Sequence, residues 1–182
     1  MAEVPPPGFY EFLDFNAPLS GVRADTIARS LAAGRPTRIV DVGCGWGELL
    51  LRTLAVAPEA SGLGVDTDAQ AIDRGRARAS NRGLADRVTF TVDCATTTTD
   101  PADAVICIGA DHAYGDQQDA IRALYRIVRP GGRLLLGTGV WERPPTPAEA
   151  ASIGMEPDSL RDLAGLVDLT IGTGFRPLVP RG

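Results

Sequence analysis

Three glycines at alternate positions follow an apolar run that contains Asp41. They are Gly43, Gly45 and Gly47, in the stretch "RIVDVGCGWGELLLRTLA" at residues 38–55. Residues without a Cβ let the backbone turn sharply and let a ligand approach the main chain closely. The stretch therefore predicts a binding turn between a buried strand and a helix.

The spacing of these glycines favours a ligand that carries no phosphate. A dinucleotide fingerprint reads G-x-G-x-x-G and places a pyrophosphate at the N-terminus of the following helix. This turn reads G-x-G-x-G, and Glu48 falls in the first turn of the expected helix. A carboxylate there would repel a pyrophosphate. The turn therefore makes a nicotinamide-dependent oxidoreductase the less favoured alternative for the function.

Acidic residues end the next two apolar segments as well. Asp66 closes "SGLGVD" and Asp93 closes "RVTFTVD". Ionised carboxylates accept hydrogen bonds from neutral hydroxyl and amino groups, and a pocket edged by Asp41, Asp66 and Asp93 suits a cation. In a doubly wound sheet, ligands bind beyond the carboxyl ends of the strands, which is where we expect these residues to lie.

His112 is the only histidine and the best candidate for a general base near neutral pH. It follows the apolar run "DAVICIG" by a few residues, which predicts a place at the mouth of the site, where Asp111 could orient it. A histidine that makes structural hydrogen bonds in a loop is the alternative. Tyr10 and Tyr114 are weaker candidates for contact with a substrate.

The composition excludes several kinds of chemistry. All 18 basic residues are arginines, so Schiff-base catalysis and the phosphate-binding lysine of a P-loop are absent. One histidine cannot build a multi-histidine zinc site. Cys44, Cys94 and Cys107 are odd in number and lack C-x-x-C spacing, so we expect no disulfide framework and no metal.

The charge and hydropathy of the chain narrow its partners. The 182 residues carry a net charge of −5, which argues against nonspecific binding to nucleic acid. No apolar run is long enough to cross a bilayer, and the N-terminus "MAEVPPPGFYEF" does not read as a secretory signal. We expect a cytoplasmic protein that acts on a small molecule, with no nucleic-acid or membrane partner.

The elements that must position these residues alternate between strands and helices. Expected strands are 37–43, 61–66, 87–93, 103–109 and 133–139, and expected helices are 21–33, 47–57, 69–80, 116–128 and 160–169. Strands separated by helices predict an α/β fold with a doubly wound, mainly parallel sheet and helices on both faces. "RPGG" at residues 129–132 reads as a turn before the fifth strand.

We expect a single domain over residues 1–182. Residues 1–36 form an N-terminal lead-in and helix, residues 37–140 the ligand-binding βα core, and residues 141–182 a lid loop, a helix and a short C-terminal end. The lid is predicted from "ERPPTPAEAASIGMEPDS", which is rich in proline and small residues.

Four motifs in order resemble class I methyltransferases that use S-adenosylmethionine. "VDVGCGWGELL" resembles their first motif, "GLGVDTD" the second and "FTVDCA" the adenine loop. "ADAVICIGADHAY" followed by "LYRIVRPGGRLLLG" resembles their fourth strand, the next helix and the turn into the fifth strand. The resemblance covers roughly residues 9–141 and implies a Rossmann-like fold.

The resemblance also implies a cofactor and its contacts. S-Adenosylmethionine would place its ribose at Asp66, its adenine at Asp93 and Cys94, and its methionine end over the glycine turn, leaving S-adenosylhomocysteine as product. The implied cofactor-binding residues are Asp41, Gly43, Cys44, Gly45, Gly47, Asp66, Thr67, Asp93, Cys94, Gly109 and Ala110. Tyr10, His112, Tyr114 and Trp141 are the candidates for substrate or lid contacts.

The expected activity is methyl transfer to an oxygen, nitrogen or sulfur atom of a small molecule by in-line displacement. Such a reaction depends mainly on holding the nucleophile near the methyl carbon and in line with it. A hydroxyl acceptor would also need a base, for which His112 is the candidate. A non-catalytic relative that binds the cofactor or a partner is the alternative.

The C-terminal end departs from the family pattern of seven strands with an antiparallel hairpin at one edge. "GFRPL" looks like the start of a sixth strand, and few residues follow it. The fifth strand would then be an exposed edge, along which two copies of the chain could pair as a homodimer. The ending "LVPRG" also resembles a thrombin recognition site.

Overall fold

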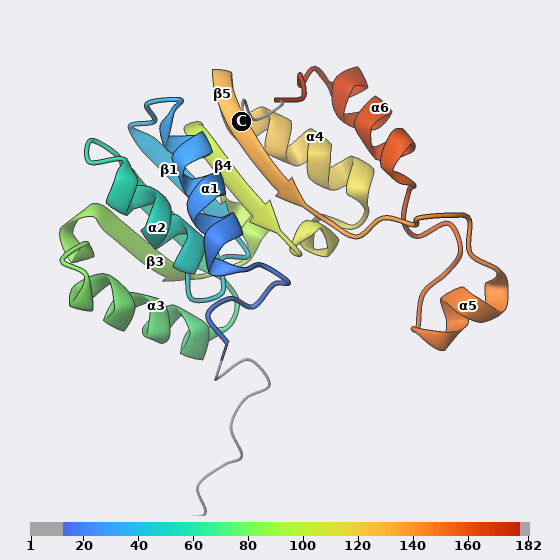
Figure 1. Ribbon diagram of the computed structural model, residues 1–182, viewed down its shortest axis with the longest axis horizontal. Helices are drawn as coiled ribbons and strands as arrows, with labels where there is room; N and C mark the ends of the chain where they lie inside the picture. The colour runs from blue at the N-terminus through green and yellow to red at the C-terminus, as the bar shows by residue number, and fades with distance from the viewer. Residues whose placement is uncertain (1–12, 179–182) are drawn as a thin grey trace, which may run out of the picture.

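The computed structural model describes residues 13–178. Five parallel strands form one sheet in the order β3-β2-β1-β4-β5 (Figure 1). The strands are β1 (Arg38–Val42), β2 (Ser61–Asp66), β3 (Val88–Val92), β4 (Ala102–Ile108) and β5 (Val128–Gly137). The predicted α/β, doubly wound, Rossmann-like fold is confirmed. Tyr10 lies outside the described residues.

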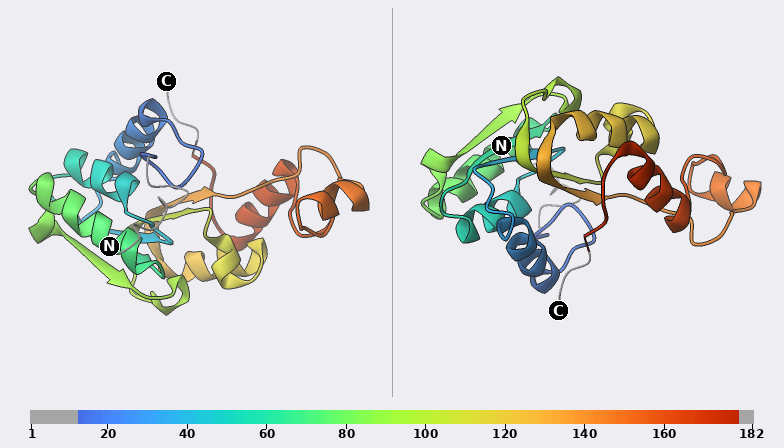
Figure 2. Two further views of the ribbon diagram at one scale, coloured as in Figure 1. Left: turned by 90° about the horizontal axis from the view of Figure 1, so that it is seen from below. Right: turned by 90° about the horizontal axis from the view of Figure 1, so that it is seen from above.

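Helices cover both faces of this sheet. The α-helices of the described residues are α1 (Gly21–Ala32), α2 (Glu48–Val56), α3 (Ala69–Asn81), α4 (Gln117–Ile127), α5 (Pro147–Ser152) and α6 (Leu163–Thr173), of which α5 projects from the body (Figure 1). Helices α1, α2 and α3 lie on one face and α4 on the other, with α6 beside α4 (Figure 2). Among the described residues, no helix is long and apolar enough to span a membrane.

The core is divided between the two faces because successive residues of a strand point to opposite sides. Ile39 of β1 and Ile106 of β4 pack with α1, α2 and α3. Val40 and Val105, their neighbours in sequence, pack on the other side with α4. Strands β1 and β4 are buried on both faces, which explains the continuous apolar run of β4 from Ala104 to Ile108.

A single carboxylate joins β1 and β4 at the end opposite the glycine turn. Asp103 accepts hydrogen bonds from the Thr37 amide (2.9 Å) and hydroxyl (2.7 Å) and from the Arg38 amide (2.9 Å). It also pairs with the Arg129 guanidinium at 2.8 Å. Burial alone would raise the pKa of Asp103, but these donors hold it well below its ordinary value.

Three helices begin where local sequence predicts. The side chains of Ser20, Asp68 and Asp116 accept hydrogen bonds from backbone amides in the first turns of α1, α3 and α4. Such short polar side chains satisfy amides that have no partner within the helix.

The chain after β4 differs from expectation in several places. Residues 129–132 are a bulge within β5 rather than a turn before it, because the pairing shifts between Ala102 and Ala104. The lid segment contains the short helix α5, which Thr146 and Glu149 cap reciprocally. Helix α6 begins after Asp162 because that side chain caps it.

The predicted sixth strand at "GFRPL" is wrong for the described residues. Helix α6 runs to Thr173, and residues 175–178 form no strand. Within the described chain β5 pairs only with β4, so its other edge has no neighbour. Pairing of two copies along this edge stays a prediction.

Candidate functional site

The glycine turn between β1 and α2 has a left-handed backbone at each glycine. The φ angles are +64° at Gly43, +53° at Gly45 and +64° at Gly47, a region that side chains with a Cβ disfavour. A Cβ at these positions would overlap, respectively, the Ala110 methyl, the Asn16 amide and the Phe90 ring. The close approach that the glycines permit is made here by protein atoms from three other segments.

The carboxyl ends of β1, β2 and β3 are joined by hydrogen bonds. Asp66 accepts from the Gly45 amide at 2.6 Å through one carboxylate oxygen and from the Asp68 amide at 2.9 Å through the other. The Asp93 amide donates to the Asp66 carbonyl at 3.0 Å. The structure therefore brings the glycine turn, Asp66 and Asp93 together along one edge of the sheet.

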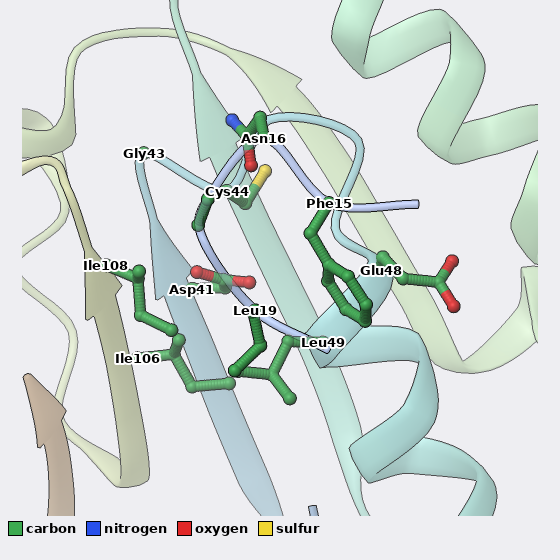
Figure 3. Close-up of a pocket in the computed structure, with 11 residues that line it drawn as sticks. Phe15, Asn16, Leu19, Asp41, Gly43, Cys44, Glu48, Leu49, Ile106 and Ile108 are labelled. Atoms are coloured by element: carbon green, nitrogen blue, oxygen red, sulfur yellow. The ribbon is translucent and has the colours of Figure 1, made fainter. Parts of the chain in front are cut away.

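Asp41 is a carboxylate buried within β1, and only 4% of the residue is exposed. Its side chain has no hydrogen-bond partner in residues 13–178. Burial raises its pKa, and the nearby charge of Asp66 raises it further. Figure 3 shows this carboxylate facing the space beneath residues 15–19.

This space is a small cavity between the lead-in and the sheet. Its lining residues are Phe15, Asn16, Ala17, Leu19, Asp41, Gly43, Cys44, Glu48, Leu49, Ile106 and Ile108. The cavity measures about 30 Å³, which holds about two water molecules. Residues 13–19 of the lead-in thus cover Asp41 and the start of the glycine turn, and we call these residues the roof.

Polar and aromatic contacts fix the roof. The Trp46 indole donates to the Asp14 carbonyl at 2.8 Å, and Arg74 donates to the Leu13 carbonyl at 2.9 Å. The Arg74 guanidinium lies 3.9 Å from the centre of the Trp46 ring, a distance at which cation–π attraction operates. Trp46 therefore packs under the lead-in.

Residues 39–132 match the model of a family described as a methyltransferase domain. The chain belongs to this family. The match contains the glycine turn, Asp66, Asp93 and the loop after β4, which are the segments that the geometry brings together.

Two curated relatives illustrate the likeness in sequence. The uncharacterized protein YjhP of Escherichia coli (strain K12) is 30% identical over 163 residues, which cover 87% of this chain and 65% of YjhP. The 27-O-demethylrifamycin SV methyltransferase of Amycolatopsis mediterranei is 32% identical over 140 residues, which cover 75% of this chain and 48% of that enzyme. The chain thus spans about half to two thirds of these relatives.

Solved structures share the fold over nearly the whole chain. A SAM-dependent methyltransferase from Geobacter sulfurreducens, crystallised with S-adenosyl-L-homocysteine, has a TM-score of 0.82 and 27% identity. The alignment covers 91% of this chain and 68% of that one. The crystal structure of E. coli YjhP has a TM-score of 0.81 and 26% identity over 91% of this chain and 69% of YjhP.

In this methyltransferase domain, Asp93 and Cys94 lie at the exposed end of β3. The Cys94 amide donates to the Asp93 carboxylate at 2.7 Å, and Thr67, which directly follows β2, is exposed. Cys44 and Cys107 are buried. Burial and the charges of Asp41 and Asp66 raise the pKa of the Cys44 thiol, which keeps it protonated and unreactive.

The loop after β4 places its candidate residues in different surroundings. Ala110 contacts the glycine turn and His112 is exposed, while Gly109 donates its amide to the Gly137 carbonyl at 2.7 Å. Asp111 accepts from the Thr138 hydroxyl at 2.7 Å, and no hydrogen bond joins it to His112 within residues 13–178.

Tyr114 and Trp141 each make a hydrogen bond to another segment of the chain. The Tyr114 hydroxyl donates to the Ala95 carbonyl at 3.1 Å, and burial raises its pKa to about 12. The Trp141 amide donates to the Arg161 carbonyl at 3.0 Å. The Trp141 indole N–H is buried and has no partner among the described residues.

Sequence reasoning missed the surroundings of Glu48. Its carboxylate, 3% exposed, pairs with Arg52 (2.8 Å), Arg78 (2.6 Å) and Arg82 (2.8 Å), and Figure 3 shows it turned away from Asp41. Arg52 also pairs with Asp25 of α1. Because arginines compensate its charge, Glu48 gives little reason to exclude a pyrophosphate. The preference for a methyltransferase over a dinucleotide-binding enzyme therefore rests on the family match.

Proposed function

We propose that this protein methylates a small molecule at an oxygen, nitrogen or sulfur atom, using S-adenosylmethionine. The observation that carries the proposal is the buried, unpartnered carboxylate of Asp41 facing a cavity at the glycine turn, in a member of the methyltransferase domain family. The Geobacter sulfurreducens relative, crystallised with S-adenosyl-L-homocysteine, supports the choice of cofactor.

The residues along the strand ends fit this cofactor by chemistry. Asp41 offers a buried negative charge to a cationic group, and such a charge is stable only when it gains a partner. Asp66 retains one free lone pair on each oxygen beyond its two backbone bonds, which suits the ribose hydroxyls. Asp93 and the Cys94 amide suit the amino group and ring of adenine.

The bound cofactor supplies an activated methyl group, and the chain supplies position and the exclusion of water. The loop after β4 would hold the acceptor, and exposed His112 is the candidate base for a hydroxyl acceptor. A relative named for methylation at an oxygen, the rifamycin enzyme, makes hydroxyl compounds the first class to screen. The acidic net charge of −5 favours a small acceptor over a nucleic acid.

The cavity of about 30 Å³ is far too small for the methionine end of the cofactor. Binding there requires the roof residues Phe15 and Asn16 to move away from Asp41 and Gly45. We therefore expect S-adenosylhomocysteine to change amide hydrogen exchange in residues 13–19, while exchange at the opposite end of the sheet near Asp103 stays the same.

Isothermal titration calorimetry tests the proposal directly. The protein should bind S-adenosylmethionine and S-adenosylhomocysteine and should not bind NADH. Asp41→Asn, which keeps the shape and removes the charge, should weaken the binding of S-adenosylmethionine by about tenfold, whereas Asp86→Asn at an exposed site should leave it unchanged. Absence of binding, or tighter binding of NADH, would overturn the proposal.

A further inference from the structure

Gln117 is a buried amide side chain at the first turn of α4, and only 5% of the residue is exposed. Its Nε2 donates to the Gly139 carbonyl at 2.8 Å and to the Thr138 hydroxyl at 3.1 Å. Its Oε1 accepts from the Arg161 amide at 2.9 Å. A backbone N–H can only donate, so the Arg161 amide fixes which end of the Gln117 side chain faces it.

The partners of Gln117 lie at both ends of a projecting segment, residues 140–161, which we call the excursion. The segment leaves the body after Gly139, carries α5, and returns at Arg161. Trp141 and Asp162 form a parallel bridge across its base, and the Trp141 amide donates to the Arg161 carbonyl. Figures 1 and 2 show α5 projecting from the body on this segment. Gln117 thus holds the outgoing and the returning ends of the excursion together.

The same side chain is linked to the loop that carries His112. Thr138 accepts from Gln117 and gives its one hydroxyl proton to the Asp111 carboxylate at 2.7 Å. The Gln117 amide thus donates to Thr138, and Thr138 donates to the negatively charged Asp111 carboxylate. Hydrogen bonds linked in such a chain strengthen one another.

We propose that Gln117 is a positioning residue that fixes the excursion at residues 140–161 and the Asp111–His112 loop relative to each other. This inference rests on the proposed function only in taking these two segments as the acceptor side of the site. Removing the amide leaves the Arg161 N–H without its acceptor and the Gly139 carbonyl with only a long hydrogen bond of 3.4 Å from the Thr138 hydroxyl, which loosens the base of the excursion. Asp111 loses the bond that orients its Thr138 donor, which loosens the loop.

Hydrogen exchange followed by NMR tests the coupling without any ligand. In Gln117→Leu, the Trp141, Arg161 and Ala113 amides should exchange about tenfold faster than in the parent protein. The Cys44 amide, bonded to the Val65 carbonyl in the core, should not change. Gln118→Leu, the same substitution one residue further along α4, is the matched control and should leave all four amides unchanged.

Faster exchange at Trp141 and Arg161 with no change at Ala113 would overturn the inference, because the two segments would then be independent. Equal acceleration of Cys44 would also overturn it, because Gln117 would then be a general structural residue. No change at any of the amides would show that the hydrogen bonds of Gln117 hold nothing in place.

Gln117→Glu supplies a conservative variant with a pH-dependent readout. When ionised, the introduced carboxylate has no proton to donate to Thr138 or Gly139, whereas its protonated form regains one donor. Trp141 fluorescence, taken as the difference from a Trp141→Phe background, should shift to longer wavelength at pH 8 and return towards the parent spectrum near pH 5. The parent and Gln117→Leu should show no such pH dependence, and a Gln117→Glu spectrum equal to the parent at both pH values would overturn the inference.

A calorimetric titration with S-adenosylhomocysteine on the same samples separates this inference from the proposed function. The hydrogen bonds of Gln117 go to Thr138, Gly139 and Arg161 and not to Asp41 or Asp66, so Gln117→Leu should bind within about threefold of the parent. If the parent does not bind, the proposed function fails, while the exchange and fluorescence results still decide the role of Gln117.

Discussion

The Asp66 carboxylate accepts a hydrogen bond from the Gly45 amide at 2.6 Å. This bond connects the end of β2 to the glycine turn that follows β1. Asp66 therefore shapes the turn, and under the proposed function it also binds a ribose. Substitutions can separate these two roles because asparagine keeps one oxygen acceptor.

We expect Asp66→Ala to weaken the binding of S-adenosylmethionine at least tenfold, because it removes charge-assisted hydrogen bonds. Asp66→Asn keeps an acceptor for the Gly45 amide and should fall between Ala and the parent. Calorimetry measures both, with Asp86→Ala as an exposed control. An unchanged affinity in Asp66→Ala would show that the ribose does not lie there.

Gly47→Ala should destabilise the fold much more than Gly83→Ala. Both glycines have a left-handed backbone, with φ of +64° and +66°, which costs alanine about 1 kcal/mol or more. A Cβ at Gly47 would also overlap the Phe90 ring, whereas nothing lies within 4 Å at Gly83. Urea denaturation should give a loss of about 3 kcal/mol at Gly47 and about 1 kcal/mol at Gly83; equal losses would show that Phe90 moves aside freely.

Glu48 should make the stability of the fold depend on acidic pH. Burial alone would raise its pKa, but hydrogen bonds and ion pairs with Arg52, Arg82 and Arg78 lower it. Because the folded pKa lies below the unfolded value, the stabilisation is present above the unfolded pKa and is lost as the pH falls through the folded pKa.

Glu48→Gln should therefore lower the free energy of unfolding by about 3 kcal/mol at pH 7. The difference from the parent should shrink as the pH falls below about 4. Urea titrations at pH 7 and pH 3 measure this, and Glu59→Gln, at an exposed position, is the control. A difference that stays constant with pH would mean that the charge of Glu48 is not what stabilises the cluster.

Cys94 should react with iodoacetamide before the other cysteines. A hydrogen bond from the Thr96 hydroxyl at 3.1 Å lowers the pKa of its thiol, whereas burial raises the pKa of Cys107 to about 12. Peptide mass spectrometry follows the order of labelling. S-Adenosylhomocysteine should slow labelling of Cys94 if the adenine lies beside it, and Thr96→Val should slow labelling without any ligand.

Features governed by neighbouring residues could be predicted from the sequence. Capping by Asp68 and Asp116 depends on side chains next to their own helices, and the turn at Gly43–Gly47 depends on backbone freedom. The carboxyl ends of parallel strands meet at one edge, so the shared location of Asp66 and Asp93 followed from the strand pattern.

Contacts between distant segments could not be predicted in this way. Asn16 fills the space beside Gly45 because of how the lead-in folds back, and no local periodicity encodes that path. The arginine partners of Glu48 lie on another helix as well as its own. Gln117 looks like an ordinary polar residue at a helix start, and only the return of Arg161 beside it explains its burial.

The Asp103 carboxylate helps to set the register between strands β1 and β4. Strands β1 and β4 are neighbours in the sheet although β2 and β3 lie between them in sequence, so contacts between distant segments must set their alignment. A slip by one residue would turn Val40 and Val42 towards the wrong layer. By accepting from two successive amides, at Thr37 and Arg38, Asp103 stabilises the native alignment, because a shifted strand would lose these hydrogen bonds.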